Sequence, residues 1–162
     1  MRRTIAPPRG VIGAAVLIAV GAAFLLAALG FPYAEGGRYL FVALGLAFAA
    51  AYLVGTRQYV YLFPAGVLCG FGVGILLPLW LGIAPDLASA VFLGTLAVGL
   101  VVVFLIAPDR RMPLVPAVIL VVVAVADVFI KVDLVPAALQ PYFVPAILVA
   151  VGLYLLQERR VR

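Results

Sequence analysis

Apolar residues in this chain run in long segments instead of alternating with polar ones. Six such segments are separated by Gly, Pro and charged residues, and they cover 11–31, 39–54, 60–82, 87–107, 113–132 and 142–156. A membrane-spanning helix needs about 20 mostly apolar residues, because the hydrocarbon core is about 30 Å thick and each residue rises about 1.5 Å. The pattern therefore predicts an all-α integral membrane protein with six transmembrane helices, of which the second and sixth are short.

Composition excludes the other broad classes. Of the 162 residues, 68% are hydrophobic and only 10% are charged. A soluble domain would carry charge on about a quarter of its residues, and a disordered chain would be poor in hydrophobic residues. We therefore expect a single transmembrane domain over 1–162, with the lipid bilayer as its main partner.

Basic residues are distributed unevenly between the two sides that six spans would create. One side holds Arg2, Arg3, Arg9, Arg57, Arg110, Arg111, Arg159, Arg160 and Arg162, whereas the other holds only Arg38 and Lys131. Because Arg and Lys accumulate in cytoplasmic loops, we expect both termini to be cytoplasmic in a bacterial inner membrane. The net charge of +5 is then a sign of topology and not of nucleic-acid binding.

The start of the chain has an alternative interpretation. Arg2 and Arg3 followed by an apolar run could form a secretory signal peptide. However, the run is longer than the usual apolar region of about 7–15 residues, and no clean A-x-A cleavage site follows it. Retention of the first span is therefore favoured.

Glycine, proline and arginine residues recur along the chain at steps of 50 to 54 residues. The matched positions are Gly13, Pro64 and Pro116; Pro32, Pro85 and Pro136; Gly45, Gly99 and Gly152; and Arg57, Arg110 and Arg160. Internal repeats of this kind indicate repeated supersecondary units. We therefore expect three tandem helical hairpins, approximately 10–57, 58–111 and 112–162. All three would begin and end on the same side, which makes them parallel repeats and disfavours an inverted-repeat transporter.

Small residues form three stripes at i, i+4 spacing. The stripes are Ala15, Ala19, Ala23 and Ala27; Ala43, Ala47, Ala51 and Gly55; and Gly66, Gly70 and Gly74. Helices in lipid associate through small residues that let their backbones approach closely. The Gly stripe predicts a close helix contact, either within the chain or between subunits. For the Ala stripes, an accident of composition is as good an explanation.

Asp127 is the one charge well inside a predicted span. Ionisable groups at such depth are candidate proton or cation sites. Lys131 lies four residues later on the same helix face, so the two side chains can instead form a structural ion pair that reaches toward the outer surface. We favour the ion pair and keep the ion site as the alternative.

The scarcity of His, Cys and Ser in the sequence excludes most catalytic mechanisms. The sequence has no His, and it has a single Cys, Cys69, and a single Ser, Ser89. Metal sites need clustered Cys, His or carboxylates, and nucleophilic serines or cysteines need an adjacent base. We therefore expect no metal, no other cofactor and no enzymatic activity.

Two segments carry a family resemblance, 62–68 (LFPAGVL) and 142–156 (YFVPAILVAVGLYLL). They resemble the hairpins of LiaI/LiaF-type bacterial transmembrane regions. The plan of three hairpins, with Phe31-Pro32 after the first span, is also similar to that of HdeD-type six-span membrane proteins. The first resemblance implies a small membrane protein that is tied to envelope-stress sensing or has no assigned role.

Taken together, the sequence predicts a small non-enzymatic bacterial inner-membrane protein with a structural or accessory role. It would act through helix and lipid contacts, as a homo-oligomer or with another membrane protein as a partner. The alternative is a small proton- or cation-linked transporter or channel that uses Asp127.

Overall fold

The computed structural model describes residues 11–34, 37–54, 57–110, 112–133, 136 and 139–160, and within these ranges the side chains of 13–153. This part of the chain is all-helical and has no strand. Its helices are α1 (Val11–Ala28), α2 (Leu40–Val54), α3 (Tyr59–Leu81), α4 (Pro85–Ile106), α5 (Leu114–Lys131) and α6 (Gln140–Arg160). Each helix lies on one of the predicted apolar segments, so the all-α prediction is confirmed.

Glycine and proline set several helix ends. After α1, Gly30 takes a left-handed conformation with φ of 69°, and Phe31 N–H donates to the Leu26 carbonyl. Gly82 does the same after α3, where Ile83 N–H donates to the Pro78 carbonyl. These bonds satisfy carbonyl groups that the last turn would leave unpaired. Pro85 opens α4, where its missing N–H costs nothing.

Three helices, α3, α4 and α5, are long and apolar enough to cross a membrane. The other three contribute shorter apolar stretches within the described residues, Gly13–Ala28, Leu40–Val54 and Gln140–Leu153. The expectation of six such helices is corrected to three by this criterion. Helix α2 falls short because it has only 15 residues, whereas for α1 and α6 the criterion covers only the described stretches Gly13–Ala28 and Gln140–Leu153.

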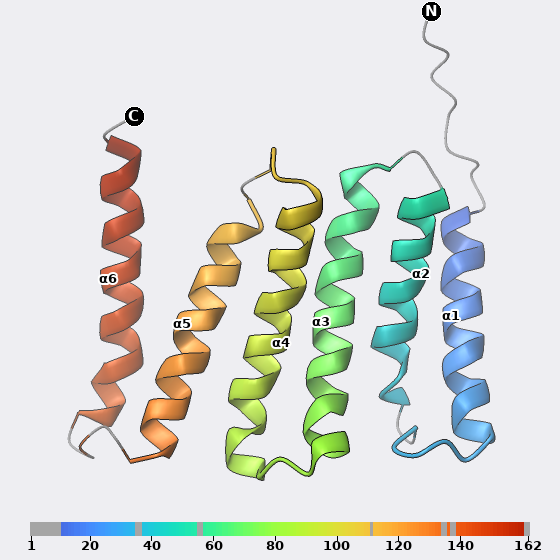
Figure 1. Cartoon of the computed structure of the whole chain (residues 1–162), viewed down its shortest axis with the longest axis horizontal. Helices are drawn as coiled ribbons and strands as arrows, with labels where there is room; N and C mark the ends of the chain where they lie inside the picture. Colours follow the sequence, from blue (N-terminus) through green and yellow to red (C-terminus); the bar gives the residue numbers. More distant parts are fainter. Residues whose placement is uncertain are drawn as a thin grey trace, which may run out of the picture.

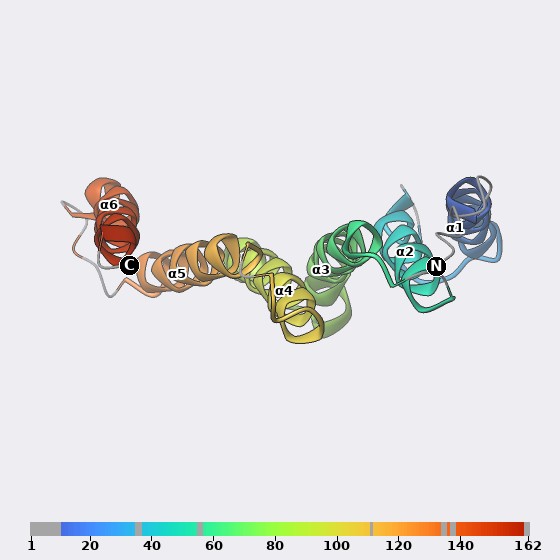
Figure 2. The same ribbon diagram turned by 90° about the horizontal axis from the view of Figure 1, so that it is seen from above.

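The helices stand side by side in chain order as a single curved layer, without a second layer behind it (Figures 1 and 2). Successive helices are antiparallel. The start of α1, the end of α6 and the α2–α3 and α4–α5 connections therefore share one edge, here the terminal edge (Figure 1). The α1–α2, α3–α4 and α5–α6 connections form the opposite, distal edge.

Packing is closest in the middle of the layer. Helix α3 makes the most extensive contacts, with α2 and α4, and the contact between α5 and α6 is the sparsest between neighbours. Most buried side chains in the described part are small, and 10 of the 15 buried hydrophobic residues are Ala. Many large apolar side chains stay exposed, such as Leu17, Phe24 and Leu105. Helix backbones therefore approach closely while both faces of the layer remain apolar.

Packing does not divide the layer into three separate hairpins. Helices α2 and α3, which belong to different predicted hairpins, contact each other about as extensively as α3 and α4 do. The matched glycines also have different neighbours: Gly45 meets α3, Gly99 meets α3 from the other side, and Gly152 has no atom of the described chain near its missing Cβ. The threefold repeat therefore stays a prediction about the sequence.

Candidate functional site

Two charged side chains of α5 and one hydroxyl of α4 come together near the distal edge. Asp127 and Lys131 lie in the last turns of α5, and Ser89 lies in the second turn of α4. Because the two helices are antiparallel neighbours, the start of α4 lies beside the end of α5 (Figure 1).

All three side chains are joined by hydrogen bonds. Lys131 Nζ lies 2.9 Å from Asp127 Oδ2 and forms an ion pair with it. The Ser89 hydroxyl donates to the same oxygen at 2.6 Å, and Lys131 Nζ also donates to the Ser89 hydroxyl. The Asp127–Lys131 pair that the sequence suggested is therefore present, and a residue from a second helix completes it.

The arrangement joins helices and offers little for catalysis. A nucleophilic serine needs a free base beside it, whereas the carboxylate that accepts a hydrogen bond from Ser89 also accepts one from Lys131. The Lys131 and Asp127 side chains are 27% and 25% exposed, so they lie at the surface of the layer and not in a closed pocket. In the described part of the chain, no three metal-binding side chains come together.

Sequence reasoning missed the role of Ser89. It was noted only as the single serine of the chain. The signal was available, because Ser89 comes near the start of one apolar segment, whereas Asp127 and Lys131 come near the end of the next one. Two antiparallel neighbours place such positions at the same depth.

The Gly stripe of α3 faces α4. A Cβ added to Gly66 would lie 2.7 Å from the Gly99 carbonyl oxygen, and one added to Gly70 would lie 2.8 Å from the Thr95 carbonyl oxygen. A Cβ added to Gly74 would lie against the side chains of Phe92 and Thr95, which also belong to α4. The contact is therefore within the chain, which the sequence had left open.

A second glycine contact joins α2 and α3, and the sequence stripes did not predict it. A Cβ added to Gly45 would lie 2.6 Å from the Cys69 backbone nitrogen, and one added to Gly72 would lie 2.6 Å from that of Val42. Cys69 thus lies at this interface, and the structure records it as a free thiol.

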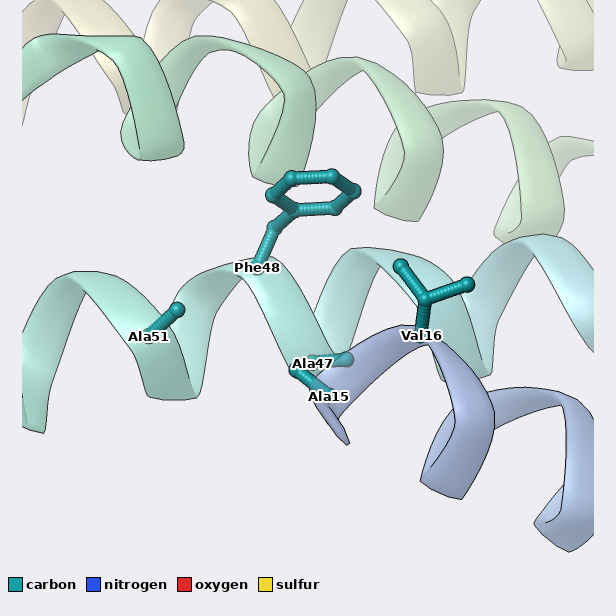
Figure 3. A pocket seen from close by; sticks show the side chains of 5 residues that line it. All are labelled: Ala15, Val16, Ala47, Phe48 and Ala51. Carbon is teal, nitrogen blue, oxygen red and sulfur yellow. The ribbon is translucent and has the colours of Figure 1, made fainter. Parts of the chain in front are cut away.

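The Ala stripes lie mainly between α1 and α2. Ala19, Ala23 and Ala51 are buried, whereas Ala15, Ala43 and Ala47 are half-buried and Ala27 is exposed. A small hollow between these helices has no room for a water molecule, and it is lined by Ala15, Val16, Ala47, Phe48 and Ala51 (Figure 3).

A wider groove of about 230 Å³ lies between α5 and α6. Its lining is apolar and includes Val125, Phe129 and Phe143.

The two edges differ in their described charges. At the terminal edge, Arg57 and Arg110 are exposed, and the Arg110 guanidinium lies over the Tyr59 ring at 5.4 Å from its centroid. At the distal edge, Arg38 is exposed and Lys131 is paired. The other residues on which the topology prediction rests lie outside the described residues or side chains: Arg2, Arg3, Arg9, Arg111, Arg159, Arg160 and Arg162. Gly55 lies outside them too.

Aromatic side chains gather where α1, α2 and α3 meet the distal edge. The Tyr39 ring contacts both Phe31 and Trp80, with centroids 6.1 and 6.2 Å apart, and its hydroxyl donates to the Pro32 carbonyl at 2.9 Å. Tyrosine and tryptophan favour the boundary between lipid and water. Their position is therefore typical of a helix layer whose distal edge lies at that boundary.

No protein-family model, curated protein or solved structure matches the chain. The resemblances to LiaI/LiaF-type and HdeD-type proteins therefore stay predictions.

Proposed function

We propose that the protein is an integral component of a bacterial inner membrane in which all six helices cross the bilayer and both termini face the cytoplasm. The apolar surface on both faces of the layer supports this placement, because only lipid or other membrane helices could cover it. The charged residues at the two edges support it as well, since a bilayer leaves the ends of spanning helices in contact with water.

Helix α2, the shortest of the six, fits this proposal through local adjustment. Helix α2 with 15 residues is about 22 Å long, which is less than the hydrocarbon thickness of about 30 Å. Short spans are accommodated by local thinning of the bilayer or by flanking side chains that reach the surface. Next to α2, Tyr39 and Arg57 are side chains of this kind.

In function, the protein is a non-enzymatic structural or accessory component that acts through helix and lipid contacts. The observation that carries this proposal is the open single layer of helices (Figure 2), whose exposed apolar side chains are available to lipid and to other membrane proteins. The resemblance to LiaI/LiaF-type regions suggests a place in the response to envelope stress.

A transporter or channel that uses Asp127 is the alternative. The geometry favours the accessory role, because the Asp127 carboxylate is bonded to Lys131 and Ser89. Purified protein reconstituted into liposomes with a trapped pH-sensitive dye separates the two. We expect proton and sodium flux no greater than in protein-free liposomes. A flux that Asp127→Asn abolishes would overturn the accessory role and establish transport.

A further inference from the structure

At the α4–α5 interface, Ser89, Asp127 and Lys131 form more than a surface ion pair. An ion pair at i, i+4 on one helix stabilises that helix alone. Here both members of the pair also bond to Ser89, which lies 38 and 42 residues earlier on α4. Both of these hydrogen bonds join side chains of two different helices. The pair is thereby fixed to a second helix.

The position of these hydrogen bonds along α4 and α5 determines which helix movement they can restrict. Helix α5 is tied to α4 at the terminal edge by the short connection 107–113, and Ser89, Asp127 and Lys131 lie near the opposite end of both helices. A helix held at one end only can tilt about that end. Bonds near the far end restrict this tilt, because they act at the greatest distance from the connection.

Helix α6 depends on the same bonds. Its main contact is with α5, and that contact is the sparsest between neighbours, with the apolar groove of about 230 Å³ alongside it. The position of α6 relative to the rest of the layer therefore follows from the position of α5.

We propose that Ser89, Asp127 and Lys131 form a clasp that sets the angle between α4 and α5 at the distal edge and so positions the α5–α6 hairpin. Ser89 is the positioning residue of the clasp, because its hydroxyl accepts from Lys131 and donates to Asp127. The inference is separate from the proposed function, because it concerns helix position whether or not anything is transported.

Distances between spin labels in the full chain, reconstituted in lipid bilayers, test the clasp. With Cys69→Ala as background, Ala84→Cys and Val132→Cys report the distal ends of α4 and α5, where both positions are exposed. Ile106→Cys and Val115→Cys report the terminal ends of the same helices and are also exposed. The second pair is the internal control for general loosening.

Ser89→Ala should shift the distal distance to larger values and broaden its distribution, whereas the terminal distance should not change. Ser89→Thr keeps the hydroxyl and should restore the wild-type distribution. Thr95→Ala is the matched control on α4, because the Thr95 hydroxyl donates to the Phe92 carbonyl of its own helix at 2.9 Å. It should change neither distance.

Three results would overturn the clasp. The first is an unchanged distal distance in Ser89→Ala, and the second is an equal change at both ends of the helices. The third is a distal change in Thr95→Ala as large as that in Ser89→Ala. Ser89 is exposed, so its replacement by Ala removes no buried packing and the variant remains a fair test.

Discussion

At the scale of single residues, Asp127 differs from the other described acids because it lies within an apolar helix and has two partners. Asn in its place keeps an oxygen that can accept from Ser89 and Lys131 but removes the charge. The Asp127 and Lys131 side chains are each about a quarter exposed, so solvent or headgroups already weaken the pair.

We therefore expect Asp127→Asn to lower the free energy of unfolding by less than about 1 kcal/mol, which is the range of exposed pairs and of hydrogen bonds between membrane helices. Reversible unfolding in mixed micelles of lipid and SDS measures this change. Asp133→Asn, an exposed acid just beyond α5, is the control and should have no effect. A loss of several kcal/mol from Asp127→Asn would mean that the carboxylate is a buried charge and not a surface pair.

At the scale of elements, the contact between α3 and α4 is decided by backbone atoms. The Cβ that an alanine would add at Gly70 lies 2.8 Å from the Thr95 carbonyl oxygen and 3.0 Å from the Leu96 Cα. Backbone atoms cannot turn away as a side chain can, so the two helices must separate.

Gly70→Ala should therefore destabilise the protein by about 1–3 kcal/mol, the usual cost of overpacking. Gly94→Ala is the matched control, since Gly94 lies on α4 with no atom within 4 Å of an added Cβ. Alanine there should be neutral or stabilise by up to about 1 kcal/mol, because it forms helices better than glycine. The same unfolding assay compares them. Equal effects of the two changes would show that close contact does not hold α3 to α4.

At the scale of the whole molecule, the antiparallel layer places both ends of the described chain at one edge (Figure 1). With nine of the eleven Arg and Lys residues assigned to that side by the sequence, the edge should be cytoplasmic.

C-terminal fusions to alkaline phosphatase and to a fluorescent protein test this orientation. We expect the fluorescent fusion to be bright and the phosphatase fusion to be inactive, because phosphatase folds only in the periplasm. A phosphatase fusion after Ile83, at the distal edge, should show the opposite behaviour. An active C-terminal phosphatase fusion would rule out six spans with cytoplasmic termini.

The sequence alone determined the all-helical class of the fold and the place of each helix. Long apolar segments can satisfy their backbone groups in lipid only as helices, so their number and approximate limits follow from hydropathy. Exact ends depended on turn geometry, and α1 is shorter than predicted because Gly30 closes the helix early. The Asp127–Lys131 pair was also predictable, since both residues lie on one helix face at i, i+4 spacing.

Only the tertiary structure decided which helix faces meet. Side chains on different helices have no fixed spacing in sequence, so neither Ser89 beside Asp127 nor Gly45 against Cys69 follows from a pattern within one segment. Apolar periodicity is no guide either, because apolar residues surround most of each helix. The choice between a bundle, separate hairpins and a single layer therefore rests on where glycine lets two backbones approach, and α3 carries such glycines toward both of its neighbours.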